Sequence, residues 1–158
     1  RGPRRGRPGL VELDHRQLGV DLYNDAWRLL EKERTPEEDD ELLHQVHAST
    51  YHWLKAPECE PKNMARGEWI CSRAYAVLGR AEPALHHAER CRAIVEANPD
   101  NMEEFDLPFA YEALARAHRV GAAEDQAERY EQLARETGAS MTDAEDVEHL
   151  EEALSTLR

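Results

Sequence analysis

Apolar residues recur at intervals of three and four along most of the chain, which is the spacing that places side chains on one face of an α-helix. The first such stretch runs from about Leu18 to Arg34, and Leu22, Ala26 and Leu29 share one face of it. Seven stretches of this kind follow one another, separated by short segments that contain Gly, Pro or Asn. The predicted helices span about 18–34, 36–56, 64–79, 81–96, 106–121, 123–135 and 143–157.

Two of these helices have a clear start signal. Thr35, Pro36 and Glu38 supply an N-cap, a first-turn proline and the acid of a capping box. Thr142 and Glu145 repeat the capping-box spacing before the last helix. That last stretch is apolar on one side only, which is typical of a terminal helix that packs on a single neighbour.

The composition agrees with an all-helical protein. Ala, Leu, Glu and Arg, which favour helices, are abundant, while Val, Ile and Thr are scarce. The chain has 158 residues, of which 41% are hydrophobic and 34% charged, so it is long enough to bury a core beneath a heavily charged surface. We therefore predict the all-α class.

The helical stretches also repeat. Gly79 and Gly121 each end the first helix of a pair and lie 42 positions apart. At the same spacing Trp27, Trp69 and Tyr111 fall in register. A single helix pair cannot bury its apolar face alone, whereas stacked pairs complete a shared core. We expect three helix–turn–helix units of about 42 residues followed by a capping helix.

The segment GEWICSRAYAVLGRAEPALHHAERCRAIVEANPD, residues 67–100, resembles the tetratricopeptide repeat family. Trp69, Tyr75, Gly79, Ala84 and Pro99 match its early aromatic, mid-helix Tyr, turn glycine, small residue and closing proline. The resemblance extends over roughly residues 18–136, although the family unit has 34 residues rather than 42. It implies a right-handed stack of antiparallel helix pairs whose first helices line a concave groove.

In the tetratricopeptide repeat family such a groove binds a peptide or protein segment, and we expect the same here, with a second copy of the chain as another occupant. The alternative is that the large aromatic residues only pack helix against helix. The resemblance places eight residues on the groove face, namely Asn24, Trp27, Glu31, Arg66, Trp69, Arg73, Tyr111 and His118.

A metal site is the competing hypothesis. His44 and His47 share a helix face, and His87 and Cys91 are spaced to do the same on another helix. Histidines from facing helices bind metals in helical bundles. However, the chain has no HExxH or CxxC motif, and adjacent His86 and His87 diverge by about 100° on a helix, which makes them poor co-ligands. The sequence also contains no nucleophilic residue at a recognisable spacing from a general base. We therefore expect neither an enzyme nor a cofactor.

Charge excludes one class of partner. The chain carries 20 basic and 33 acidic residues, a net charge of −13, and four arginines stand within the first seven residues. Such an acidic body repels phosphate backbones, so we expect no nucleic-acid partner. Residues 1–10, rich in Arg, Gly and Pro, are expected to be a disordered leader or a segment foreign to the native chain, and 11–158 a single helical domain.

The remaining sequence features concern location. No apolar run approaches the roughly 18–20 residues that a membrane span needs, so we expect no membrane insertion. The leader has no apolar segment after its basic residues, unlike a secretory signal. Three cysteines are too few for a disulfide framework. These features favour a cytoplasmic protein.

Overall fold

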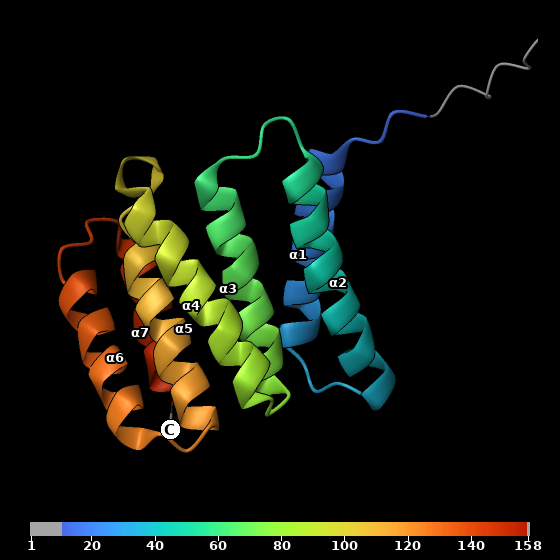
Figure 1. The fold of residues 1–158 in the computed structure, drawn as a ribbon. Helices are drawn as coiled ribbons and strands as arrows, with labels where there is room; N and C mark the ends of the chain where they lie inside the picture. The colour runs from blue at the N-terminus through green and yellow to red at the C-terminus, as the bar shows by residue number, and fades with distance from the viewer. Residues whose placement is uncertain (1–10, 158) are drawn as a thin grey trace, which may run out of the picture.

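The predicted all-helical fold is confirmed. The computed structural model describes residues 11–157, and within this range it contains seven α-helices, a short 3-10 turn at Pro99–Asn101 and no strand (Figure 1). The predicted leader at 1–10 lies outside the described residues. The helices are α1 (His15–Leu30), α2 (Pro36–Lys55), α3 (Pro61–Val77), α4 (Ala81–Ala97), α5 (Asp106–Val120), α6 (Glu124–Gly138) and α7 (Ala144–Ser155).

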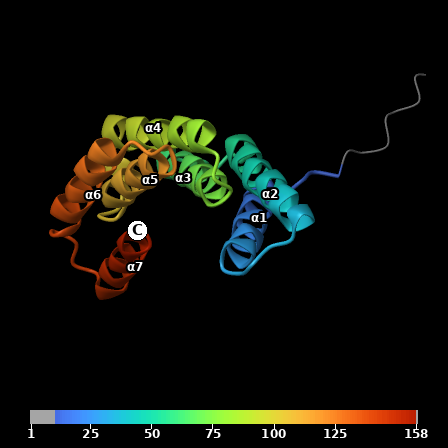
Figure 2. The same ribbon diagram turned by 90° about the horizontal axis from the view of Figure 1, so that it is seen from below.

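Consecutive helices form three antiparallel pairs, α1–α2, α3–α4 and α5–α6, and α7 packs against α5 and α6. Viewed along the helices, the pairs follow an arc in which α2, α4 and α6 lie outside and α1, α3 and α5 lie inside (Figure 2). Helices α1 and α7 face each other from opposite ends of this arc. None of the described helices combines the length and apolar character needed to cross a bilayer.

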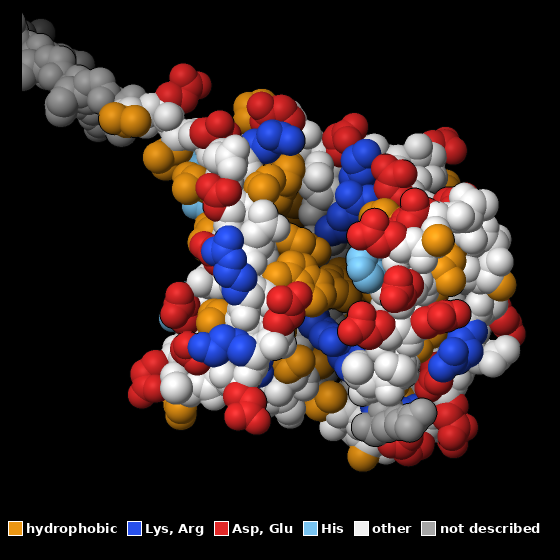
Figure 3. Space-filling model, turned by 180° about the vertical axis from the view of Figure 1, so that it is seen from behind, with side chains coloured by type: hydrophobic (Ala, Val, Ile, Leu, Met, Phe, Trp, Pro, Cys, Tyr) orange, Lys and Arg blue, Asp and Glu red, His pale blue; other side chains and the backbone are white. Residues whose placement is uncertain are grey.

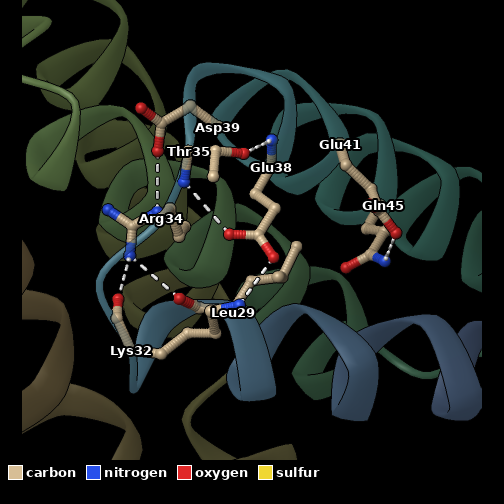
Figure 4. Close-up of polar contacts among 8 residues, drawn as sticks. All are labelled: Leu29, Lys32, Arg34, Thr35, Glu38, Asp39, Glu41 and Gln45. Carbon is tan, nitrogen blue, oxygen red and sulfur yellow. Dashed lines mark hydrogen bonds and ion pairs between the residues drawn. The ribbon is translucent and has the colours of Figure 1, made fainter.

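The turn between α1 and α2 is held by side chains (Figure 4). The Thr35 hydroxyl accepts a hydrogen bond from the Glu38 amide, and the Glu38 carboxylate accepts one from the Thr35 amide, as the capping-box spacing predicts. The Arg34 guanidinium donates to the carbonyl oxygens of Leu29 and Lys32 and to the Asp39 carboxylate. The chain reverses here without a glycine.

Several predicted boundaries differ from the observed ones by up to four residues, and at α1 and α7 side chains explain the difference. Helix α1 ends at Leu30 rather than Arg34, since Arg34 folds back onto the carbonyl groups at the helix end. At α7 the N-cap is Asp143, whose carboxylate accepts from two backbone amides of the first turn. Thr142, the expected cap, instead donates to the Glu104 carboxylate from both its amide and its hydroxyl.

The turns of the second and third pairs have the same geometry. After α3, the Arg80 amide bonds to the Tyr75 carbonyl, and Gly79 adopts a left-handed φ of 71°. After α5, the Ala123 amide bonds in the same way and the left-handed residue is Ala122, with φ 56°. Both turns follow the Schellman pattern, which ends a helix with a left-handed residue. Gly79 and Ala122 are 43 positions apart, so the glycine match at 42 aligned the turns one residue out of register.

Small residues bring neighbouring helices together, both within a pair and between pairs. Ala84, Ala88 and Ala117 are buried where α4 meets α5, and the Ser72 hydroxyl donates to the carbonyl oxygen of Ala84 across α3 and α4. Larger apolar side chains, such as Ile70, fill the space between the pairs. The inner helices are therefore held firmly, which fixes the positions of the side chains on the concave face.

Candidate functional site

A cavity of about 760 Å³ opens on the concave side between α1, α3, α5 and α7. We call it the groove. Figure 3 shows this face of the molecule, with apolar side chains on the floor of a hollow and charged ones around it. Six of the ten aromatic residues of the chain line the groove, including every tryptophan: Tyr23, Trp27, Trp53, Trp69, Phe105 and Phe109.

The aromatic rings of the floor contact one another in sequence. Trp27 of α1 and Trp69 of α3 stack with ring centroids 5.6 Å apart. Trp69 meets Phe109 of α5 edge to face at 5.9 Å, and Phe109 meets Phe105 in the same manner at 6.4 Å. Such arrangements suit the ring quadrupoles. They join three helices into one apolar surface that remains partly open.

One charged residue of the groove lies directly on this surface. The Arg66 guanidinium donates two hydrogen bonds of 3.0 Å to the Asp106 carboxylate and stands 4.8 Å over the Phe105 ring. The Asp106 side chain is only 3% exposed. Burial alone would lower the pKa of Arg66, but the Asp106 carboxylate holds that pKa above its usual value. The Arg66 guanidinium therefore keeps its charge and stays bound to this carboxylate.

A second arginine of the groove lining, Arg73, lies seven residues after Arg66 on α3. Arg73 is 3.3 Å from the Glu112 carboxylate, which Arg116 approaches to 2.6 Å. Burial and the neighbouring Arg116 lower the pKa of Arg73. Arg116 also donates to the Ala153 carbonyl and the Thr156 hydroxyl at the end of α7. These contacts attach α7 to α5 and so build the far wall of the groove.

The structure places five of the eight residues expected on the groove face in the groove lining: Trp27, Glu31, Arg66, Trp69 and Arg73. Asn24 is exposed on α1 and is not among the lining residues. Tyr111 and His118 stack on Tyr130 of α6 instead, with centroids 6.1 and 5.5 Å apart. Tyr111 and His118 therefore lie on the face of α5 that is turned toward α6.

Several lining residues were missed by the sequence interpretation. Phe105 and Phe109 recur at a spacing of four around the start of α5, a signal that could have placed them on one face. Trp53, by contrast, comes from an outer helix and packs on Gly19, where even a β-carbon would lie 2.9 Å from its ring. The contribution of α7 depends on how the chain folds back after α6, and no local pattern indicates that.

The tryptophans both pack and line the groove. Trp69 is partly buried and contacts three of the core clusters, while one edge of it faces the groove. Its indole nitrogen has no hydrogen-bond partner among the described residues. The two roles proposed for these rings from the sequence are therefore compatible at Trp69 and Trp27.

Comparisons with family models, with curated proteins and with solved structures each found no match. The function of the chain is therefore inferred from the chemistry of its own side chains. Besides the aromatic and charged residues of the groove, the histidines and the cysteine thiols are the other chemically reactive side chains of the described residues.

The four residues of the metal hypothesis do not converge. His44 lines a shallow hollow between α1 and α2, and Cys91 is buried beside the groove. His47 and His87 do approach each other, with centroids 5.5 Å apart, but each has another partner. The His47 ring bonds to the Tyr75 hydroxyl at 2.8 Å, and the His87 ring to the Glu68 carboxylate at 2.6 Å. Within 11–157 no three His, Cys, Asp or Glu side chains are grouped so as to hold a metal ion.

The buried thiols are chemically quiet. Burial raises the pKa of Cys71 to about 12 and raises that of Cys91 as well, so both are protonated near neutral pH. Because the thiolate is the nucleophilic form, neither is activated for attack. Both side chains act as small apolar residues of the core.

Proposed function

We propose that this protein is a non-catalytic interaction module whose groove binds a segment of another protein. The observation that carries the proposal is the concentration of aromatic side chains in one open cavity. Aromatic residues dominate the energetics of protein interfaces, and ligand sites are concave and mostly apolar with a few placed polar groups. The volume of about 760 Å³ falls within the range of about 300–1,000 Å³ for such sites.

The architecture supports the proposal. A tetratricopeptide-like stack would present the first helix of each pair to a ligand, and α1, α3 and α5 supply most of the groove here. The second and third pairs repeat at 43 residues, longer than the usual 34. We include a tetratricopeptide-like superhelix in the proposal, with longer helices and an added wall from α7.

Selection from a random peptide display library tests the proposal. We expect peptides that bind the full chain and that lose binding when Ala153→Phe fills the groove wall. Ser155→Phe is the matched control, because it adds the same ring to the same helix at an exposed position outside the lining. Melting curves verify that both variants fold. Peptides that bind both variants as well as the unchanged chain, or no binding peptides at all, would contradict the proposal.

A further inference from the structure

The charges around the groove do not cancel. Six charged residues lie in the lining, two basic and four acidic. Arg66 is matched by Asp106 through two hydrogen bonds. Arg73 pairs with Glu112, which lies outside the lining and is shared with Arg116. The other three lining acids have no ion pair among the described residues, and these are Glu31, Asp146 and Glu152.

These three acids stand on the two walls. Glu31 is at the end of α1, while Asp146 and Glu152 belong to α7, which faces α1 across the concave side (Figure 2). Between the walls lies the aromatic floor. A ligand in the groove would therefore meet apolar rings below and unmatched negative charge on both sides.

The groove already contains an example of how a basic side chain binds there. Arg66 lies over the Phe105 ring while its guanidinium forks onto the Asp106 carboxylate. A guanidinium lies flat on aromatic rings and binds a carboxylate through two parallel hydrogen bonds, and a lysine ammonium lacks this planar, two-pronged geometry. The rings of the floor and the unpaired carboxylates of the walls offer a ligand the same two kinds of contact.

We propose that the segment bound in the groove is basic, with arginine side chains interspersed among apolar ones. The proposal rests on the proposed function, and adds the chemistry of the partner to it. Apolar side chains pack on the tryptophans and phenylalanines, and the guanidinium groups pair with the wall acids. The net charge of −13 also draws a cationic segment toward the protein from a distance.

Calorimetric titration with designed peptides tests this. The probe is an acetylated and amidated eight-residue peptide of alternating leucine and arginine. Three matched peptides replace arginine with lysine, citrulline or glutamate, and citrulline keeps the shape while removing the charge. We expect affinity to fall in the order arginine, lysine, citrulline, glutamate, and to weaken as salt rises.

Two variants of the full chain locate the effect. One neutralises the wall acids, Glu31→Gln, Asp146→Asn and Glu152→Gln. The other neutralises three exposed acids on the same two segments outside the lining, Glu33→Gln, Glu148→Gln and Glu151→Gln. Both change the net charge equally, so a difference between them reports position. We expect about a tenfold loss of arginine-peptide affinity in the first variant and little change in the second.

The outcomes distinguish a failure of the basic-partner inference from a failure of the proposed peptide-binding function. Equal losses in both variants, or equal binding of the citrulline peptide, would overturn the basic partner while a peptide-binding groove remained. If none of the four peptides binds and the library selection also yields none, both proposals fail.

One further variant identifies an internal occupant. If the probe binds only after Arg1, Arg4, Arg5 and Arg7 are changed to Gln, the chain's own leader fills the groove, and the inference of a separate partner is wrong. Concentration-dependent sedimentation that is abolished by Ala153→Phe would instead make a second copy the occupant and would equally overturn it.

Discussion

The pairs α3–α4 and α5–α6 are two versions of one structural unit. Comparing them indicates which positions maintain the helix packing and which do not. In the first, Tyr75 on the inner helix stacks on His87 on the outer one, with rings 5.7 Å apart and inclined by 4°. In the second, His118 stacks on Tyr130 at 5.5 Å and the same 4°. The two stacks are 43 residues apart with tyrosine and histidine exchanged. The two units therefore share the geometry of the stack but not the residue type at each position.

The groove positions differ much more. Trp69 of the first unit corresponds, 43 residues later, to Glu112 of the second. The tryptophan lies on the aromatic floor, whereas the glutamate is 1% exposed and holds two arginines. Equivalent positions therefore supply a ring of the groove floor in one unit and a buried carboxylate outside the groove lining in the other. The following predictions test how far the two units are equivalent.

The largest effect is expected at Glu112. Changing Glu112→Ala leaves Arg73 and Arg116 without their shared carboxylate, and removing one partner of a buried ion pair costs about 3–5 kcal/mol. Chemical denaturation at neutral pH measures this loss. Glu148→Ala, on the exposed face of α7, is the control and should change stability by less than about 0.5 kcal/mol. A loss below about 1 kcal/mol at Glu112 would show that the arginines do not depend on it.

The next largest loss of stability is expected at Trp69, the position of the α3–α4 unit that corresponds to Glu112. Trp69→Ala should lose about 3 kcal/mol, at the lower end for such a change because the ring is only partly buried. Trp69→Phe, which keeps an aromatic contact with Trp27, should lose less. An unchanged melting temperature in Trp69→Ala would mean that the ring belongs to the groove surface alone and not to the core.

Exchanging glycine and alanine at the turns that follow α3 and α5 should change stability in opposite directions. Gly79→Ala forces a β-carbon into a left-handed conformation and should cost about 1 kcal/mol, since nothing lies within 4 Å of that carbon to compensate or clash. Ala122→Gly relieves the same strain and should stabilise by about 1 kcal/mol. Thermal melts of both variants check the pair. Changes of the same sign would break the equivalence of the turns.

The smallest effect is expected from the histidine stack. Burial lowers the pKa of His118 below 6.5, although Glu89 opposes this. The unfolded chain then binds more protons than the folded one, so stability falls as pH drops through 6.5 and levels off below the folded pKa. Burial lowers the pKa of His47 too, which adds a loss of the same sign.

Denaturation midpoints at pH 7.5 and 5.5 test this. His118→Phe keeps the stack and should reduce the difference between the two midpoints, and His47→Phe with His118→Phe should reduce it further. A larger difference in the double variant would contradict the assigned direction of these shifts.

Local signals predicted most of the fold but only part of the groove. The Thr35 capping box and the Gly79 turn depend on neighbouring residues, and both were read correctly from the sequence. The register of the units was not, because Gly121 stands where the backbone needs no glycine and Ala122 takes the left-handed conformation instead. Trp53 and the acids of α7 reach the groove through long-range packing, which no spacing along the chain records.

The tryptophan indole groups offer the most direct test of the groove. All three line it, so the indole N–H signals of a nitrogen-15-labelled chain report on its lining. Addition of the leucine–arginine peptide should shift all three signals and leave the backbone signals of α6 unchanged. If the peptide binds and the indole signals stay fixed while signals of the outer helices move, the groove is not the binding site.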